Sequence, residues 1–168
     1  GINAQEKDWA NLQRYAQQNA ELPKPDKNEK RVVFMGNSIT EGWVNTHPDF
    51  FKSNGYIGRG IGGQTSYQFL VRFREDVINL SPALVVINAA TNDIAENTGA
   101  YHEDRTFGNI VSMVELAKAN HIKVILTTTL PAAAFGWNPA IKDAPQKIAS
   151  LNARLKAYAQ TNKIPFVD

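Results

Sequence analysis

The chain has 168 residues, of which 43% are apolar and 20% charged, as in an ordinary single-domain globular protein. Lys and Arg exceed Asp and Glu by only 18 − 16 = 2, and the basic residues are scattered, so the sequence shows no nucleic-acid-binding footprint. No apolar run reaches the roughly 18 residues of a membrane span, and the absence of cysteine excludes disulfides, thiol catalysis and cysteine-ligated metals.

The first thirty residues predict a helix and a linker that pack on the main domain, which we place at residues 31–168. Apolar side chains recur near the helical period over residues 5–22, and Pro23-Lys24-Pro25 then breaks the pattern. The aromatic residues of this helix are expected to be core anchors. Ile2-Asn3-Ala4-Gln5 is compatible with the remnant of a cleaved export signal, which favours a periplasmic or extracellular protein, with a cytoplasmic one as the alternative.

From residue 31 onward, strand patterns alternate with helix patterns. Buried strands are predicted over residues 32–35, 56–60, 83–88, 122–128 and 164–167. Helices are predicted from a cap at Thr65 or Ser66 through residue 78, and over residues 104–120 and 144–162, with a short helical or irregular piece over residues 47–54. Strands that alternate with helices of ten or more residues predict an α/β fold, with right-handed crossovers and a parallel sheet covered on both faces.

A serine follows the first predicted strand. The strand runs into Gly36-Asn37-Ser38, a small polar turn of the kind that presents a nucleophile at a strand's end, so Ser38 is the candidate nucleophile. The same turn could simply connect the strand to a helix and cap that helix. It is not the nucleophile elbow of the α/β-hydrolases, because Thr40 stands where that motif has its second glycine.

Two further small polar loops follow the next two strands. Gly62-Gly63 follows the second strand and Thr91-Asn92-Asp93 follows the third. Because the carboxyl ends of parallel strands meet at one edge of a sheet, we expect both loops to lie near Ser38. The backbone N–H groups of Ser38 and Gly63 and the side-chain amide of Asn92 would then supply three donors for a developing oxyanion.

These blocks resemble those of the SGNH or GDSL hydrolases. The matching residues are Gly36-Asn37-Ser38-Ile39-Thr40, Gly63 within residues 59–65, and Ala90-Thr91-Asn92-Asp93. The resemblance covers residues 31–168 and implies a flavodoxin-like three-layer α/β/α fold with a central five-stranded parallel sheet, the SGNH hydrolase fold. It also implies a cofactor-independent esterase with Ser38 as nucleophile and Gly63 and Asn92 as oxyanion donors.

The chain departs from the family's pattern in three places. Asn37 replaces the usual aspartate and Ala90 a glycine, both small changes. The family's base is a histidine in a D-x-x-H motif after the fifth strand, and the sequence stops before that block. None of the histidines present, His47, His102 and His121, fits the motif, and we assign none of them as the base. We therefore expect the sequence as given to be nearly inactive alone, with about 10³–10⁴-fold residual acceleration over water, and a longer parent protein to be an esterase.

No cofactor and no metal are expected. Residues 58–63 match the dinucleotide pattern G-x-G-x-x-G. In a dinucleotide site, however, this pattern follows the first strand and an acidic residue lies about 20 positions later, whereas here it follows the second strand and no acidic residue lies at that distance. The sequence holds no HExxH motif and no Cys/His cluster of a zinc site.

Two tryptophans are candidates for substrate binding. Trp43 lies close behind Ser38, and Trp137 lies in an apolar loop over residues 130–143. Together they could form an aromatic wall that stacks on a sugar or holds a short acyl chain, or they could equally well cover helix ends. The predicted function is hydrolysis of short acyl esters, with O-acetyl groups on carbohydrate as the favoured substrate. A lysophospholipid or thioester substrate and a catalytically silent carbohydrate-binding module are the alternatives, and the sequence does not predict the oligomeric state.

Overall fold

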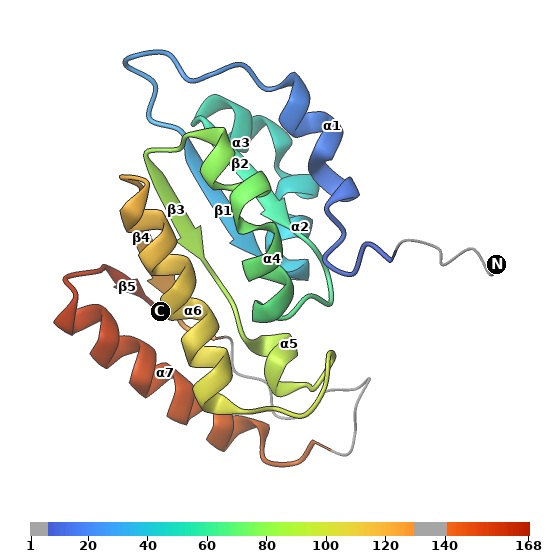
Figure 1. Cartoon of the computed structure of the whole chain (residues 1–168), viewed down its shortest axis with the longest axis vertical. Coiled ribbons are helices and arrows are strands. Elements are labelled where there is room, and N and C mark those ends of the chain that lie inside the picture. The colour runs from blue at the N-terminus through green and yellow to red at the C-terminus, as the bar shows by residue number, and fades with distance from the viewer. Residues whose placement is uncertain (1–6, 130–140) are drawn as a thin grey trace.

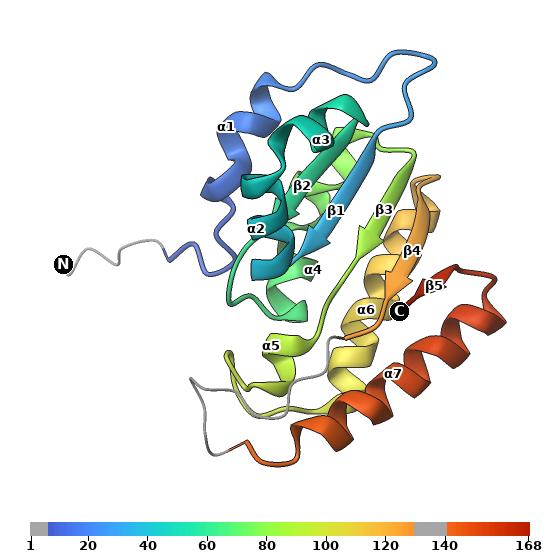
Figure 2. The same cartoon turned by 180° about the vertical axis from the view of Figure 1, so that it is seen from behind.

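A computed structural model describes residues 7–129 and 141–168, and its centre is a five-stranded sheet (Figures 1 and 2). The strands are β1 (Val32–Gly36), β2 (Tyr56–Gly60), β3 (Leu84–Ile87), β4 (Lys123–Thr127) and β5 (Phe166–Val167). All neighbours pair in parallel, in the order β2-β1-β3-β4-β5. This is the flavodoxin-like order, and it confirms the predicted α/β fold.

Helices connect the strands and lie on both faces of the sheet. They are α1 (Gln13–Glu21), α2 (Ser38–Thr46), α3 (Pro48–Ser53), α4 (Ser66–Asp76), a 3₁₀ turn (Ile78–Leu80), α5 (Thr91–Ile94), α6 (Glu103–Ala119) and α7 (Ala144–Thr161). α4, α6 and α7 pack on one face, whereas α2 and α3 pack on the other face over β1 and β2 (Figures 1 and 2). The edge of the sheet at which the sequence predicts the site is the one where β1 is followed by α2 and β3 is followed by α5.

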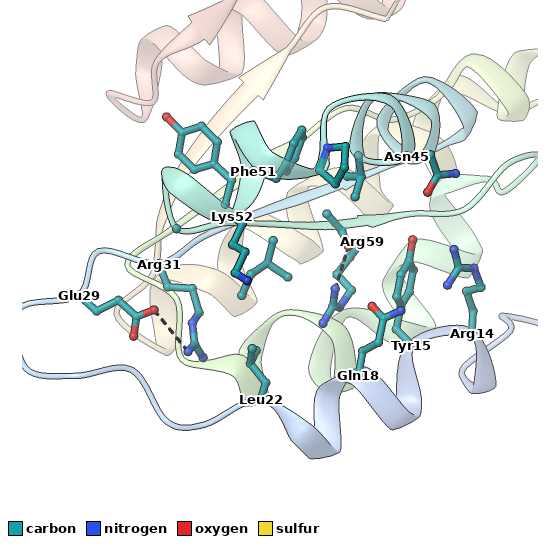
Figure 3. A pocket seen from close by; sticks show the side chains of 16 residues that line it. Arg14, Tyr15, Gln18, Leu22, Glu29, Arg31, Asn45, Phe51, Lys52 and Arg59 are labelled. Atoms are coloured by element: carbon teal, nitrogen blue, oxygen red, sulfur yellow. Dashed lines mark hydrogen bonds and ion pairs between the residues drawn. The ribbon is translucent and has the colours of Figure 1, made fainter.

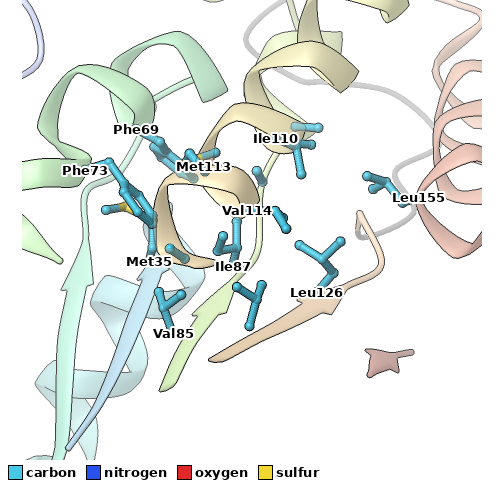
Figure 4. Close-up of a cluster of buried hydrophobic side chains, with 14 of the residues drawn as sticks. Met35, Phe69, Phe73, Val85, Ile87, Ile110, Met113, Val114, Leu126 and Leu155 are labelled. Atoms are coloured by element: carbon cyan, nitrogen blue, oxygen red, sulfur yellow. The ribbon is translucent and has the colours of Figure 1, made fainter. Parts of the chain in front are cut away.

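The main core lies between the sheet and the helices of the first face (Figure 4). Alternate side chains of β1, β3 and β4 point into it, because successive residues of a strand face opposite sides. The fully buried members drawn there include Met35, Phe69, Phe73, Val85, Ile87, Ile110, Met113, Val114, Leu126 and Leu155. On the opposite face, Leu84, Val86 and Ile125 are half-buried, as are Val32 and Phe34 of β1.

The structure corrects three predicted elements. The helix predicted over residues 5–22 begins at Gln13, because the Asp8 carboxylate accepts hydrogen bonds from the N–H groups of Leu12 and Gln13, each at 2.9 Å, and so ends the preceding turn. Helix α2 begins at Ser38, where helical character was expected only from residue 47. The polar loop expected after the third strand forms the short helix α5.

The N-terminal segment is hydrogen-bonded to the end of β2 and the loop that follows it. The Tyr15 hydroxyl donates to the Gly60 carbonyl at 2.5 Å, and the Gln64 side chain donates to the Ala10 carbonyl at 2.6 Å. Tyr15 is buried as expected, but Trp9 is 53% exposed, so the expectation that it anchors the core is wrong. Residues 8–21 thus support the scaffold of the candidate site.

Candidate active site

Ser38 is the first residue of α2, directly after β1, and its side chain is exposed. Asn37 caps the helix: its side-chain oxygen accepts from the Ile39 N–H at 3.3 Å, and its carbonyl accepts from the Glu41 N–H at 3.0 Å. The first N–H groups of a helix have no acceptor within the helix and carry the positive end of its dipole. The turn therefore caps a helix and exposes a serine at once, so the two interpretations of this turn are compatible.

Two glycines allow this turn to lie directly on the ends of the strands. Gly36 and Gly60 are paired in register between β1 and β2. A Cβ atom on Gly60 would lie 2.5 Å from the Glu41 nitrogen and 2.8 Å from the Asn37 carbonyl oxygen. Both are backbone atoms of the turn that carries Ser38, so the absence of a side chain at Gly60 is required for this geometry.

The loop after β2 passes beside the serine. A Cβ atom built on Gly62 would lie 3.5 Å from the Ser38 Cβ, and the Gly62 N–H donates to the Glu41 carboxylate at 3.4 Å. Gly63 has a left-handed φ of 78°, which favours glycine. The Asn97 side chain donates to the Gly63 carbonyl at 3.0 Å. The loop is thus held from α2 on one side and from the segment after α5 on the other.

Asn92 lies on α5, with 6% of its surface exposed, and is tied to the same loop. Its side-chain N–H₂ donates one hydrogen to the Gln64 carbonyl at 3.0 Å. Because an amide nitrogen carries two hydrogens, a second donor remains. The loop after β2 therefore lies beside Ser38 and is hydrogen-bonded to Asn92 through Gln64, which brings the three strand-end segments together at one edge of the sheet, as the strand-end argument predicts.

Asp93, which the sequence patterns do not single out, connects the helices at this edge of the sheet. Its carboxylate accepts from the Ser66 N–H at 2.7 Å, from the Ser66 hydroxyl at 2.5 Å and from the Thr106 hydroxyl at 2.9 Å. Burial raises the pKa of Asp93, and these hydrogen bonds oppose that shift. The carboxylate thereby joins the first turns of α4 and α6 to α5, which carries Asn92.

Ala90 precedes α5 in a strained conformation. Its φ is 92°, and it is 2% exposed. A β-carbon in the left-handed region costs about 1–2 kcal/mol, which explains why the resembling family has glycine at this position.

We expect Ala90→Gly to change the free energy of unfolding by less than about 0.5 kcal/mol, because relief of strain offsets the lost methyl burial of about 0.8 kcal/mol and the added chain entropy. The matched control is Ala89→Gly, a buried neighbour without a positive φ, which should cost about 1.5 kcal/mol. Urea unfolding of both variants measures the difference. Equal losses in the two variants would show that Ala90 stores no strain.

Trp43 lies in an aromatic cluster between α2, α3 and the sheet. Its ring is 39% exposed, stacks on Phe50 at 5.8 Å between centroids and meets Phe34 and Phe51 edge-on at 5.5 and 4.8 Å. Trp137 lies outside the described residues. The predicted role of the two tryptophans in substrate binding stays a prediction.

None of the three histidines forms a hydrogen bond with Ser38. His47 follows α2, where its Nδ1 lies 2.8 Å from the Thr46 hydroxyl; His102 precedes α6; and His121 follows α6 with a φ of 60°. All three are exposed. Within the described ranges there is no group of three or more carboxylate or imidazole side chains that could hold a metal ion.

Comparison with known sequences identifies one family. The pattern of the GDSL-like lipase/acylhydrolase family matches residues 34–168. A curated relative, the uncharacterized lipoprotein YqeF of Bacillus subtilis (strain 168), is 32% identical over 117 residues, which are 60% of this chain and 48% of that protein. The chain thus spans about half the length of this relative.

Solved structures agree with the fold. A candidate acylhydrolase from Bacteroides fragilis NCTC 9343 is 99% identical with a TM-score of 0.96, over 97% of this chain and 78% of that one. A GDSL-like lipase from Bacteroides thetaiotaomicron VPI-5482 is 79% identical with a TM-score of 0.92, over 94% and 77%. An acetylxylan esterase from Geobacillus stearothermophilus shares the fold at 19% identity and a TM-score of 0.61, over 83% and 75%.

Proposed function

Because the chain belongs to the GDSL-like lipase/acylhydrolase family, we propose that it is a serine esterase in which Ser38 is the nucleophile. The observation that carries the proposal is the exposed Ser38 at the N-terminus of α2, with the Gly62-Gly63 loop against it. In the proposed reaction the Ser38 Oγ attacks the ester carbonyl while its proton passes to a general base, and the alcohol leaves. Water then releases the acid from the acyl-enzyme.

Three donors would stabilise the oxyanion that forms in each step. They are the N–H of Ser38, the N–H of Gly63 and the second hydrogen of the Asn92 amide, whose first hydrogen is held by Gln64. Loss of one such donor typically costs about 10²–10³ in turnover. The base is assigned to none of His47, His102 and His121, because none of them is hydrogen-bonded to Ser38 in the described part of the chain.

For the substrate we propose a short acyl ester, with an O-acetyl group on carbohydrate favoured. Support comes from the half-exposed Trp43 on the same helix as Ser38, since aromatic rings stack on sugars, and from the shared fold of the acetylxylan esterase. We also propose that the protein acts outside the cytoplasm, since its curated relative is named a lipoprotein. No helix in the described ranges is long and apolar enough to cross a bilayer.

Labelling of the natural protein with a fluorophosphonate, read by intact mass, tests the nucleophile. The reagent reacts with activated serines, so we expect one adduct that disappears in Ser38→Ala. The matched control is Ser53→Ala, an exposed serine at the end of α3, which should label like the unchanged protein. A natural protein that forms no adduct would refute the esterase and leave a carbohydrate-binding module on the same fold.

A further inference from the structure

A hollow lies along the edge strand β2, and Ser38, Gly63 and Asn92 do not line it (Figure 3). Helix α1 forms one wall, and α3 with the end of α2 forms the other. We call it the α1–β2 pocket. Its volume is about 460 Å³, which is the size of a site for a small organic molecule.

The α1–β2 pocket carries an excess of positive charge. Its lining includes one carboxylate and four cations, which are Glu29, Arg14, Arg31, Lys52 and Arg59. Arg31 pairs with Glu29 at 3.5 Å, and Arg14 pairs with Glu41, on α2, at 3.6 Å. Within the part of the chain that the structure describes, no carboxylate forms an ion pair with Arg59 or Lys52.

Arg59 is a buried cation with two N–H groups that no protein acceptor in the described ranges engages. It is 4% exposed, and its Nε and Nη2 donate to the Asn19 side-chain oxygen at 3.0 and 2.8 Å, while Nη1 donates to the Gly58 carbonyl at 2.8 Å. A guanidinium has five N–H groups, so one hydrogen on each Nη remains. Burial lowers the pKa of Arg59, and the charge of Asp76 opposes this shift.

Asp76 neutralises Arg59 only in part, because its carboxylate is bonded to other groups. Its carboxylate forms a fully buried salt bridge with Arg72 at 3.1 Å and accepts from the Asn19 side chain at 2.7 Å. Two buried guanidinium groups therefore share one carboxylate. Since a buried charge is costly unless a counter-charge accompanies it, Arg59 favours an anion in the pocket beside it.

Two more cations, Arg31 and Lys52, line the α1–β2 pocket. Arg31 is 3% exposed and is held by the carbonyls of Leu80 and Pro23, yet its Nε has no hydrogen-bond partner in the described ranges. Lys52 is exposed, and Figure 3 shows its side chain extending into the hollow toward Arg31. An ammonium offers three donors, so unengaged N–H groups belong to Arg59 and Lys52, and Arg31 adds a third positive charge to the lining.

We propose that the α1–β2 pocket binds a small organic anion through a phosphate or carboxylate group, which Arg59, Lys52 and Arg31 hold. Leu22, Phe51 and Ile57 supply apolar surface for the rest of the molecule. The pocket is separate from Ser38, so the proposal is independent of the esterase activity.

Calorimetric titration with inorganic phosphate, and separately with acetate, tests the proposal at an ionic strength kept constant with sodium chloride. We expect saturable binding of at least one anion, weakened at least fivefold by Lys52→Ala. Lys118→Ala is the matched control, because Lys118 is likewise an exposed lysine in the last turn of its helix, and it should change the affinity less than twofold. Ser38→Ala should bind the anion as the unchanged protein does.

The location is checked by NMR, where the Nε–Hε signal of Arg59 should shift during the titration. Tighter binding of phosphate would support a phosphorylated ligand, and tighter binding of acetate a carboxylate ligand. Binding of neither anion, or equal affinity in the two lysine variants, would overturn the proposal.

Discussion

Gly60→Ala is expected to destabilise the protein by about 3 kcal/mol and to slow fluorophosphonate labelling of Ser38 by about 10²-fold. The added methyl would overlap the Glu41 nitrogen and the Asn37 carbonyl oxygen, and these backbone atoms cannot rotate away as a side chain could. The turn that carries Ser38 must therefore move. Such a shift misplaces a nucleophile, and a displacement of about 1 Å can cost 10²-fold in rate.

Gly42→Ala provides the matched control on the helix that Ser38 begins. A Cβ atom there meets no atom within 4 Å, so the substitution should fit and raise helix stability by about 0.5–1 kcal/mol. Thermal unfolding and labelling kinetics, measured on both variants, separate the two effects. A Gly60→Ala protein that labels as fast as the unchanged one would contradict the proposed role of Gly60 in seating the turn.

Arg72→Met is expected to lower the free energy of unfolding by about 3–5 kcal/mol, the usual cost of breaking a buried ion pair. Arg72 and Asp76 are both fully buried, and the guanidinium also donates to the Gln64 side chain at 2.7 Å. The substitution leaves the Asp76 carboxylate without its salt-bridge partner. It also releases Gln64, whose backbone carbonyl holds Asn92.

The matched control is Arg154→Met, which removes an arginine paired with Glu103 at 3.2 Å and Asp104 at 2.7 Å. Because these pairs lie at the surface, we expect a loss below about 1 kcal/mol. Urea unfolding of both variants, of Asp76→Leu, and of Arg72→Met combined with Asp76→Leu gives the coupling between the buried partners. If the double variant loses as much free energy of unfolding as Arg72→Met and Asp76→Leu lose in sum, the ion-pair explanation is contradicted.

Much of the fold could be predicted from the sequence, because the signals that carried it are local. The apolar run of β1 followed by Gly36-Asn37-Ser38 indicates a strand and a turn within one short window. The alternation of strands and helices then implies parallel pairing, which brings the loops after β1, β2 and β3 to one edge. The positions of Ser38, Gly63 and Asn92 at that edge follow from this reasoning without coordinates.

Element boundaries were less well predicted, since they depend on single hydrogen bonds. Asp8 delays the start of α1 until Gln13, although the apolar period continues upstream of it. Likewise α5 begins directly after Ala90, which takes a left-handed conformation that alanine disfavours. The pattern of apolar residues predicts neither the hydrogen bonds of Asp8 nor the backbone conformation of Ala90.

The sequence by itself determined the alternation of strands and helices along the chain, the family resemblance and the serine at the end of β1, because periodicity and turn chemistry act between near neighbours. Only the tertiary structure decided what supports that serine and what surrounds it. The close packing of Gly60 on the turn and the hydrogen bonds from Arg59 to Asn19 join residues from separate segments, and the Arg72–Asp76 pair is fully buried only in the folded protein. Their energies come from burial and from distance in space, and neither is set by position along the chain.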